Sequence, residues 1–262
     1  MGIFHVQMSF ALYLSFATLA QSALKVSSIT RGAPLRVLPL GDSITFGYNE
    51  LSGNSYRRDL ECFLYVGGNP VSMIGSVQNG DWGNNQSDAF NLHTIDEIRE
   101  AGTPELTQKV NRPNVILLHA GTVNFVVGTN VTNAAERLGS LIDFITLHNP
   151  ATLLVVSQLI TNANTTVNAL VNRYNTQLPA VVAQRARAGE KVVLTSMDDV
   201  KVGDLPDGTH PNEVGYHKMA VSWFNAISEA GVRGLITPAE GSFMDAGSFS
   251  LSPSGDCEDL TD

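Results

Sequence analysis

Five short stretches of the chain consist almost entirely of apolar residues, and they constrain the fold more than any other feature. None shows the alternation of polar and apolar residues that marks a strand with one face in water. Continuous runs rich in Leu and Val are typical of strands that are covered on both faces, as in a parallel sheet. The five runs are Leu35–Leu40, Val71–Ser76, Asn114–Gly121, Thr152–Gln158 and Lys191–Met197.

Segments with helical periodicity lie between these runs. Apolar residues recur at i, i+3, i+4 and i+7 over Leu138–Ile145 and over Ala220–Ile227. Asn133 is expected to cap the first helix, and Pro211 with Asn212 stands at the entry of the second. Further helices are expected over Tyr56–Tyr65, over Ile95–Val110 with a break near Gly102–Pro104, and over Thr166–Arg187 with a kink or split at Pro179. Strands that alternate with helices predict an α/β fold, a three-layer α/β/α sandwich around a five-stranded parallel sheet.

The chain divides into three parts along its length. Residues 1–20 contain an apolar, uncharged run from Met8 to Ala20, which is typical of a signal peptide, with a buried N-terminal helix as the alternative. Residues 35–230 carry the strand and helix pattern of one domain. Residues 231–262 are rich in Gly, Ser and Pro and predict an irregular acidic tail. No other stretch is long and apolar enough to span a bilayer, so we expect a secreted, extracellular protein.

Glycosylation signals and cysteines bear on the same question. Sequons begin at Asn85, Asn130 and Asn164, and each is compatible with a secreted glycoprotein. The two cysteines, Cys62 and Cys257, leave two alternatives open. They form one disulfide that closes a very long loop, or Cys62 is buried and Cys257 is free in the tail.

The charge of the chain and the motifs that it lacks argue against several classes of ligand and partner. The net charge is −9, and no cluster of Lys or Arg occurs. Nucleic acid and anionic membrane surfaces are therefore poor partners. The sequence has no His and Cys spacing typical of a metal site and no phosphate-binding loop, so we expect no metal and no cofactor. A monomer that acts on a small, neutral substrate is the simplest expectation.

Two polar segments follow the first and the last of the predicted strands. Gly41-Asp42-Ser43 allows a tight turn that places a serine at a helix start, although an ordinary N-cap serine is the alternative. Asp207 and His210 stand three residues apart, so the carboxylate can hold Nδ1–H and leave Nε2 free to accept a proton; a surface histidine in a helix-entry turn is the alternative. Because ligands bind beyond the carboxyl ends of parallel strands, the two segments can converge in one site.

These segments resemble the first and last blocks of a known family. Gly-Asp-Ser-Ile-Thr at 41–45 and Asp-Gly-Thr-His-Pro-Asn at 207–212 are similar to the end blocks of the SGNH hydrolases. Further likeness to the acetylxylan-esterase-like branch occurs at Asn54–Arg57, Met73–Ser76, Gly215–Tyr216 and Met219–Ala220. The resemblance covers the chain from Leu35 to about Ile227. It implies a flavodoxin-like sheet and a serine ester hydrolase that acts without a cofactor on acetylated carbohydrates or other small esters, with a lysophospholipase-like esterase as an alternative.

The resemblance also implies a role for individual residues. Ser43 is the expected nucleophile, and its backbone N–H is one donor to the oxyanion. His210 is the expected general base and then the general acid to the leaving alcohol, and Asp207 orients it. Asp42 and Val123 are expected to contact the substrate. Activity should rise with pH as His210 loses its proton, because the base must accept one.

Two further blocks of the SGNH pattern are altered in this chain. The third strand ends in Gly121-Thr-Val-Asn124, so Val123 stands where the family has a donor asparagine, and Asn124 would need a backbone shift to donate instead. Leu92 replaces the glycine of the second block, and its N–H can still donate although leucine disfavours a glycine conformation. Loss of one oxyanion donor lowers a rate by about 10²–10³. The runner-up hypothesis is therefore a catalytically weak carbohydrate-binding protein, and the added aliphatic surface of Leu92 and Val123 is compatible with a longer acyl chain.

Overall fold

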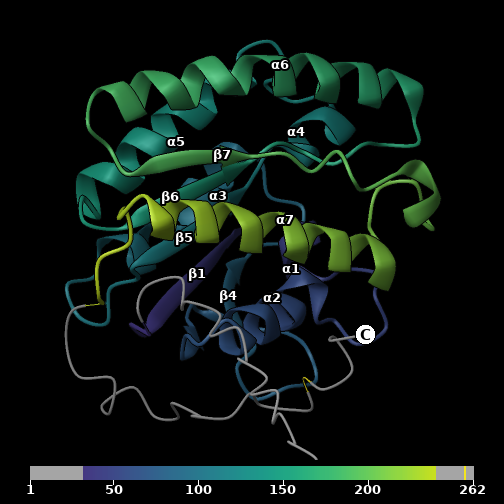
Figure 1. Ribbon diagram of the computed structural model, residues 1–262. Helices are drawn as coiled ribbons and strands as arrows, with labels where there is room; N and C mark the ends of the chain where they lie inside the picture. Colours follow the sequence, from purple (N-terminus) through teal and green to yellow (C-terminus); the bar gives the residue numbers. More distant parts are fainter. Residues whose placement is uncertain (1–31, 240–256, 258–262) are drawn as a thin grey trace, which may run out of the picture.

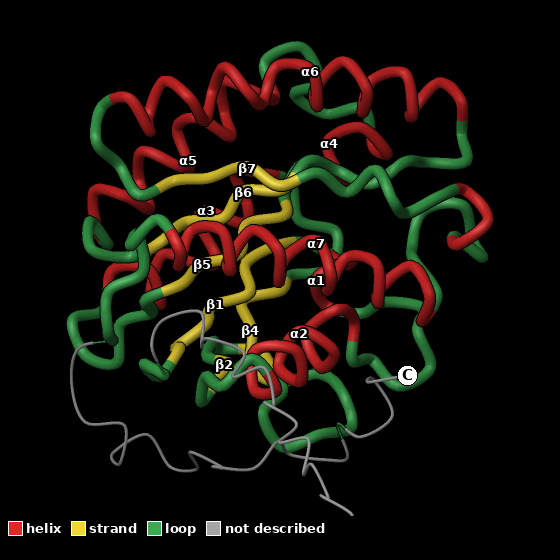
Figure 2. The backbone as a smooth tube through the Cα atoms, in the orientation of Figure 1, coloured by secondary structure: helices red, strands yellow, loops and turns green. Residues whose placement is uncertain are grey.

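The computed structural model describes residues 32–239 and Cys257 (Figure 1). A sheet of seven strands lies between two layers of helices, in the order β3-β4-β1-β5-β6-β7 with β2 also paired to β1 (Figure 2). The strands are β1 (Leu35–Gly41), β2 (Val71–Met73), β3 (Val77–Gln78), β4 (Gln86–Ala89), β5 (Val115–His119), β6 (Leu153–Ser157) and β7 (Val192–Thr195). All pairs are parallel except β3 with β4. The predicted α/β/α sandwich around a mainly parallel sheet is confirmed, but the sheet has seven strands and not the five expected, because β3 and β4 were not predicted.

The second predicted strand, Val71–Ser76, is wrong in its extent, because two strands share its place beside β1. β2 pairs with the first half of β1, and β4 pairs with Leu40 and Gly41 at its end. The chain leaves the sheet at Gly75, which has φ of +145° and lies so close to the Ser87 backbone that a Cβ atom would meet it at 2.1 Å. Only glycine fits that approach. β3 then returns antiparallel to β4, which carries the chain back to β1.

Seven helices of the described chain cover the two faces of the sheet. The helices are α1 (Ser43–Phe46), α2 (Ser55–Val66), α3 (Ile95–Thr107), α4 (Thr122–Val127), α5 (Ala134–His148), α6 (Thr165–Arg187) and α7 (Glu213–Val232). α3, α4, α5 and α6 cover one face, and α1, α2 and α7 cover the other (Figure 1). Successive residues of β1 show the division, since Leu38 and Leu40 pack with the first group whereas Leu35 and Val37 pack with the second. This alternation is the period of two that a strand imposes.

Two helices continue through residues that predicted a break. α3 runs through Gly102 and Pro104 to Thr107, and α6 is a single helix through Pro179. A proline inside a helix costs about 3 kcal/mol, whereas a fully buried Leu or Val side chain contributes about 1.5–3 kcal/mol. Leu178 and Val182, on either side of Pro179, are both buried, so the packing of α6 on the core outweighs the lost hydrogen bond.

The ends of α5 and α7 differ in how they are capped. Asn212 caps α7 as predicted, since its side chain accepts the Gly215 N–H at 2.9 Å. Asn133 stands at the predicted N-cap of α5, but its side chain makes no capping bond, and its Oδ1 atom instead accepts Nε–H of Arg137 at 3.1 Å. The guanidinium thus occupies the acceptor that the helix N–H groups would otherwise use.

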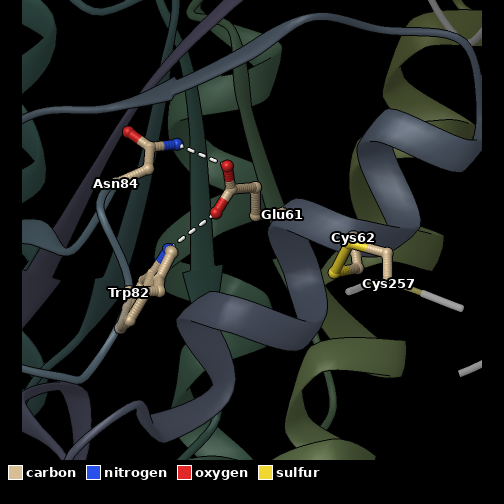
Figure 3. The surroundings of a disulfide bond; sticks show 5 residues. All are labelled: Glu61, Cys62, Trp82, Asn84 and Cys257. Atoms are coloured by element: carbon tan, nitrogen blue, oxygen red, sulfur yellow. Dashed lines mark hydrogen bonds between the residues drawn. A yellow bond between two sulfur atoms is a disulfide. The ribbon is translucent and has the colours of Figure 1, made fainter. Parts of the chain in front are cut away.

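A disulfide joins Cys62 of α2 to Cys257, which decides between the two alternatives that the sequence left open (Figure 3). Beside it, the buried carboxylate of Glu61 accepts hydrogen bonds from Trp82 Nε1 at 2.6 Å and from Asn84 Nδ2 at 2.9 Å. The predicted signal peptide lies outside the described residues, as do residues 240–256 and 258–262 of the predicted tail. Across the described residues, we find no helix with the length and apolar character needed to cross a membrane.

Candidate active site

The turn after β1 presents Ser43 at the carboxyl edge of the sheet. Gly41 is required there, because a Cβ atom would lie 2.3 Å from Thr45 Oγ1 and 2.5 Å from the carbonyl oxygen of His119. Asp42 caps α1 by accepting the Ile44 N–H at 3.0 Å, so Ser43 is not the N-cap that the sequence offered as an alternative. Its hydroxyl is therefore available to another partner.

That partner is His210, in the loop before α7. Ser43 Oγ lies 2.9 Å from His210 Nε2, and His210 Nδ1 lies 2.7 Å from Asp207 Oδ2. Asp207 Oδ1 also accepts the backbone N–H groups of Thr209 and His210, at 2.9 and 2.7 Å. Burial alone would raise the pKa of Asp207, but the hydrogen bonds from His210 and Thr209 outweigh it and lower this pKa to about 2. The structure thus brings together the three residues that the sequence singled out, with an ionised carboxylate behind the imidazole.

The loop after α1 adds two contacts that the sequence reasoning missed. Asn49 Nδ2 donates to Asp207 Oδ2 at 3.1 Å, the same oxygen that faces His210 Nδ1. Asn49 has φ of +64°, a conformation that asparagine tolerates better than most residues. The ring of Tyr48 lies 4.9 Å from the ring of His210. The only sequence signal for this loop is its composition, and it does not reveal which residue reaches the carboxylate.

Two residues that line the cavity, Ser43 and Leu92, have backbone N–H groups that are free to donate. Among the residues that the structure describes, the N–H groups of Ser43 and Leu92 have no hydrogen-bond partner. Leu92 adopts φ of +60°, so it takes the left-handed conformation that suits the glycine expected there. Its side chain lies in the wall of the cavity around Ser43. The backbone of Leu92 therefore has the conformation of the expected glycine, and the residue differs from glycine in adding a side chain to the cavity.

The segment after β5 differs from the expectation for Asn124. Val123 lines the cavity as expected, but Asn124 is completely buried and faces away from it. Asn124 Oδ1 accepts the Ile95 N–H at 3.1 Å, and Nδ2 donates to the carbonyl oxygen of Thr129 at 3.0 Å. The amide therefore ties the start of α3 to the end of α4 and is not placed to donate to an oxyanion. Thr122 also lines the cavity, and its buried Oγ1 has no partner within the described chain.

Asp42 does not reach the cavity, contrary to the expectation that it contacts the substrate. It is completely buried, and its Oδ1 atom lies 3.7 Å from Nδ1 of the equally buried His119. Neither ring nitrogen of this histidine has a hydrogen-bond partner within the described chain. Both side chains are therefore buried under the turn that carries Ser43, where Asp42 accepts the Ile44 N–H.

A cavity of about 280 Å³ opens onto the serine. Its lining residues are Ser43, Tyr48, Asn91, Leu92, Thr122, Val123, Val126, Val127, Thr209 and His210. In the described residues, no group of three or more His, Cys, Asp or Glu side chains is arranged to hold a metal ion. An α/β/α sandwich that links serine, histidine and carboxylate at its carboxyl edge has the architecture of a serine-dependent hydrolase.

Comparison with known families agrees with that architecture. The family model described as GDSL-like Lipase/Acylhydrolase matches residues 37–223. The chain therefore belongs to this family of ester hydrolases, the SGNH family that the sequence blocks resemble.

Within the family, the chain is similar to several individual esterases. A multidomain esterase of Ruminococcus flavefaciens is 28% identical over 249 residues, which cover 84% of this chain and 31% of that protein. The chain thus spans about a third of that relative's length. The family 3 carbohydrate esterase of Clostridium thermocellum superposes with a TM-score of 0.68 at 25% identity, over 78% of this chain and 100% of that structure. A family 3 carbohydrate esterase of Talaromyces cellulolyticus shares the fold, with a TM-score of 0.64 at 18% identity over 76% and 99% of the two chains.

Proposed function

We propose that this chain is a secreted serine ester hydrolase that acts on acetylated carbohydrates or other small esters. The observation that carries the proposal is the continuous contact from Ser43 Oγ through His210 to Asp207. Ser43 Oγ attacks the ester carbonyl carbon while His210 Nε2 accepts its proton. His210 then gives that proton to the leaving alcohol, and a water molecule hydrolyses the acyl-serine with the same assistance. Asp207 stabilises the imidazolium that forms in each half of the cycle.

The N–H groups of Ser43 and Leu92 are the proposed oxyanion donors. Both belong to residues that line the cavity, and neither N–H has a hydrogen-bond partner in the described chain, which supports this role. Val123 offers no third donor, and Asn124 is held by Ile95 and Thr129. Because one donor is worth about 10²–10³ in rate, we expect slow turnover for an enzyme of this class.

The proposed substrate class rests on the relatives. The C. thermocellum and T. cellulolyticus structures are carbohydrate esterases, and the R. flavefaciens protein is an esterase. The net charge of −9 favours neutral esters over anionic ones.

Secretion is supported by three independent features. Residues 1–20 have the composition of a signal peptide, and the Cys62–Cys257 disulfide is typical of an oxidising compartment. Asn130 and Asn164 are exposed, so both sequons are accessible to a glycan. Asn85 is less suited, because it is only partly exposed and its Nδ2 atom donates to the Gly80 carbonyl oxygen at 3.0 Å, whereas the Nδ2 atom of the exposed Asn130 makes a longer bond of 3.4 Å to Asp96 Oδ2.

The first test is hydrolysis of p-nitrophenyl acetate by the purified wild type and by Ser43→Ala. We expect measurable turnover by the wild type and a loss of about 10³-fold or more in the variant, because the nucleophile is absent. Circular dichroism should show the same fold in both proteins. Equal rates would remove Ser43 as the nucleophile. A folded but silent wild type would favour the runner-up, a carbohydrate-binding protein that keeps the fold without useful turnover.

A further inference from the structure

One wall of the catalytic cavity is made of aliphatic side chains that are left exposed. Leu92 is 78% exposed, Val126 49% and Val127 56%, and all three line the same cavity as Ser43. Val123, the fourth aliphatic residue of this wall, is buried beneath them. A cluster of exposed apolar side chains at the mouth of a site marks a surface that a ligand covers.

Leu92 gives the strongest reason to assign a ligand to this wall. Its φ of +60° places a leucine in the left-handed region, which is unfavourable for a residue with a Cβ atom. Its exposed side chain contributes little packing to the folded protein in return. Backbone strain of this kind is concentrated at functional sites. The side chain of Leu92 thus lies at the cavity and not in the core, on a backbone held in place for its N–H.

The reaction geometry shows which part of the ester faces the wall. His210 Nε2 must reach the oxygen of the leaving alcohol, so the alcohol lies on the side of His210, Thr209 and Tyr48. The carbonyl oxygen points to the N–H groups of Ser43 and Leu92. The acyl chain is the remaining substituent of the carbonyl carbon, and the remaining wall is the aliphatic one.

We propose that Leu92, Val123, Val126 and Val127 receive the acyl chain, and that the preferred esters carry an acyl group longer than acetyl. This inference rests on the proposed function and sharpens its substrate class. Each methylene group that the wall covers is worth about 0.8 kcal/mol, which corresponds to about fourfold in kcat/KM. Butyrate has two more methylene groups than acetate, so its kcat/KM should be higher by about fourfold to fifteenfold.

The test holds the alcohol constant and varies the acyl chain. The kcat/KM values for p-nitrophenyl acetate, butyrate and hexanoate are measured with the wild type, with Val127→Thr and with Val66→Thr. Val66 is a matched control, because it is also the last residue of its helix, is also 56% exposed, is also followed by glycine, and does not line the cavity. Threonine keeps the shape of valine and adds a hydroxyl, so folding should be preserved in both. We expect the butyrate-to-acetate ratio to fall about threefold or more in Val127→Thr and to stay at the wild-type value in Val66→Thr.

The outcomes separate the acyl preference from the activity itself. If the wild type hydrolyses acetate faster than butyrate and hexanoate, the acyl-chain proposal is wrong and the esterase proposal stands. If none of the three esters is hydrolysed, the proposed function fails first. A second series keeps acetate and compares hexyl acetate with an acetylated monosaccharide. If Val127→Thr changes that ratio and leaves the acyl series unchanged, the wall binds the alcohol and our assignment is overturned.

Discussion

Val123 is the residue at which this site departs most sharply from an efficient hydrolase. It lines the cavity at the start of α4, where the family pattern has an asparagine, and it presents only methyl groups to the reacting ester. The neighbouring Asn124 does not compensate, because both ends of its amide are bonded to the backbone of other segments. In the proposed mechanism the oxyanion therefore has two backbone donors, and a substitution at Val123 can supply a side-chain donor.

Val123→Asn should raise kcat for p-nitrophenyl acetate. A restored donor that meets the oxyanion only as charge develops accelerates the chemical step, and about tenfold or more is expected out of the 10²–10³ that one donor is worth. KM should change little. Val66→Asn places the same amide on an exposed valine that does not line the cavity, and it serves as the control. An unchanged or lower kcat in a folded Val123→Asn protein would show that the defect lies elsewhere.

The site residues differed in how far the sequence could predict them. Ser43 and His210 follow the first and last parallel strands, so topology alone brings them to one edge of the sheet. Asn124 was misjudged because its hydrogen bonds reach the backbone of Ile95 and Thr129, and side-chain direction in a loop depends on such tertiary partners. Asn49 was missed for the same reason, because the acceptor it meets is 158 positions away in the sequence.

At the scale of elements, α2 holds the loop whose Tyr48 and Asn49 contact His210 and Asp207. Arg57 of α2 is completely buried, and its guanidinium donates to the carbonyl oxygens of Phe46, Gly53, Asn79 and Asn85. Two of these acceptors bracket the loop that carries Tyr48 and Asn49. Burial lowers the pKa of Arg57 to about 10, so the group stays charged at neutral pH and its hydrogen bonds stay charge-assisted.

Arg57→Lys should destabilise the fold and slow the enzyme together. Lysine carries a single nitrogen, so it cannot reach all four carbonyl groups, and a buried hydrogen bond to a charged group is worth about 1.5–3 kcal/mol. We expect a loss of about 3 kcal/mol or more in the free energy of unfolding, measured with urea, and a lower kcat. The control is Arg58→Lys, one residue further along α2, since Arg58 makes none of these hydrogen bonds. Equal stability of the two variants would contradict the anchoring role.

The sequence did not predict strand β4, and the reason lies in how this element is held. β4 has the sequence Gln-Ser-Asp-Ala and no apolar run, yet it pairs with the end of β1 and is largely buried. Its place depends on the close approach of Gly75 to Ser87 and on Asp88, whose Oδ1 atom accepts the N–H and Oγ–H of Ser76, each at 2.8 Å. Hydrogen bonds of side chains, not hydrophobic pattern, set this strand. β1, β5 and β6 needed no such detail, because every residue in them is buried and burial on both faces already specified them.

Across the whole molecule, carboxyl groups of two kinds set how stability depends on pH. The pKa of Asp207 is lowered to about 2, below its unfolded value of about 3.9, so its contribution is present above about pH 4 and is lost as pH falls toward 2. Burial raises the pKa of Asp88, and burial together with the charge of Asp88 raises that of Glu105. Their contribution is present below the unfolded value and is lost as pH rises through the folded one. Stability should therefore be greatest in mildly acidic solution.

Asp88→Asn tests whether burial of this carboxylate lowers the free energy of unfolding as the pH rises to neutral. The amide oxygen can accept both hydrogen bonds from Ser76, and the amide nitrogen replaces Oδ2, which is buried without a partner in the described chain. The variant thus resembles the protonated aspartic acid and has no charge to bury as pH rises. We expect a higher free energy of unfolding than the wild type at pH 7, nearly the same value at pH 4, and a flatter curve between them. Urea unfolding at each pH measures this, with the exposed Asp199→Asn as the control. A wild-type slope in Asp88→Asn would mean that the buried carboxylate is already solvated or compensated, and that a decline of stability toward neutral pH has another origin.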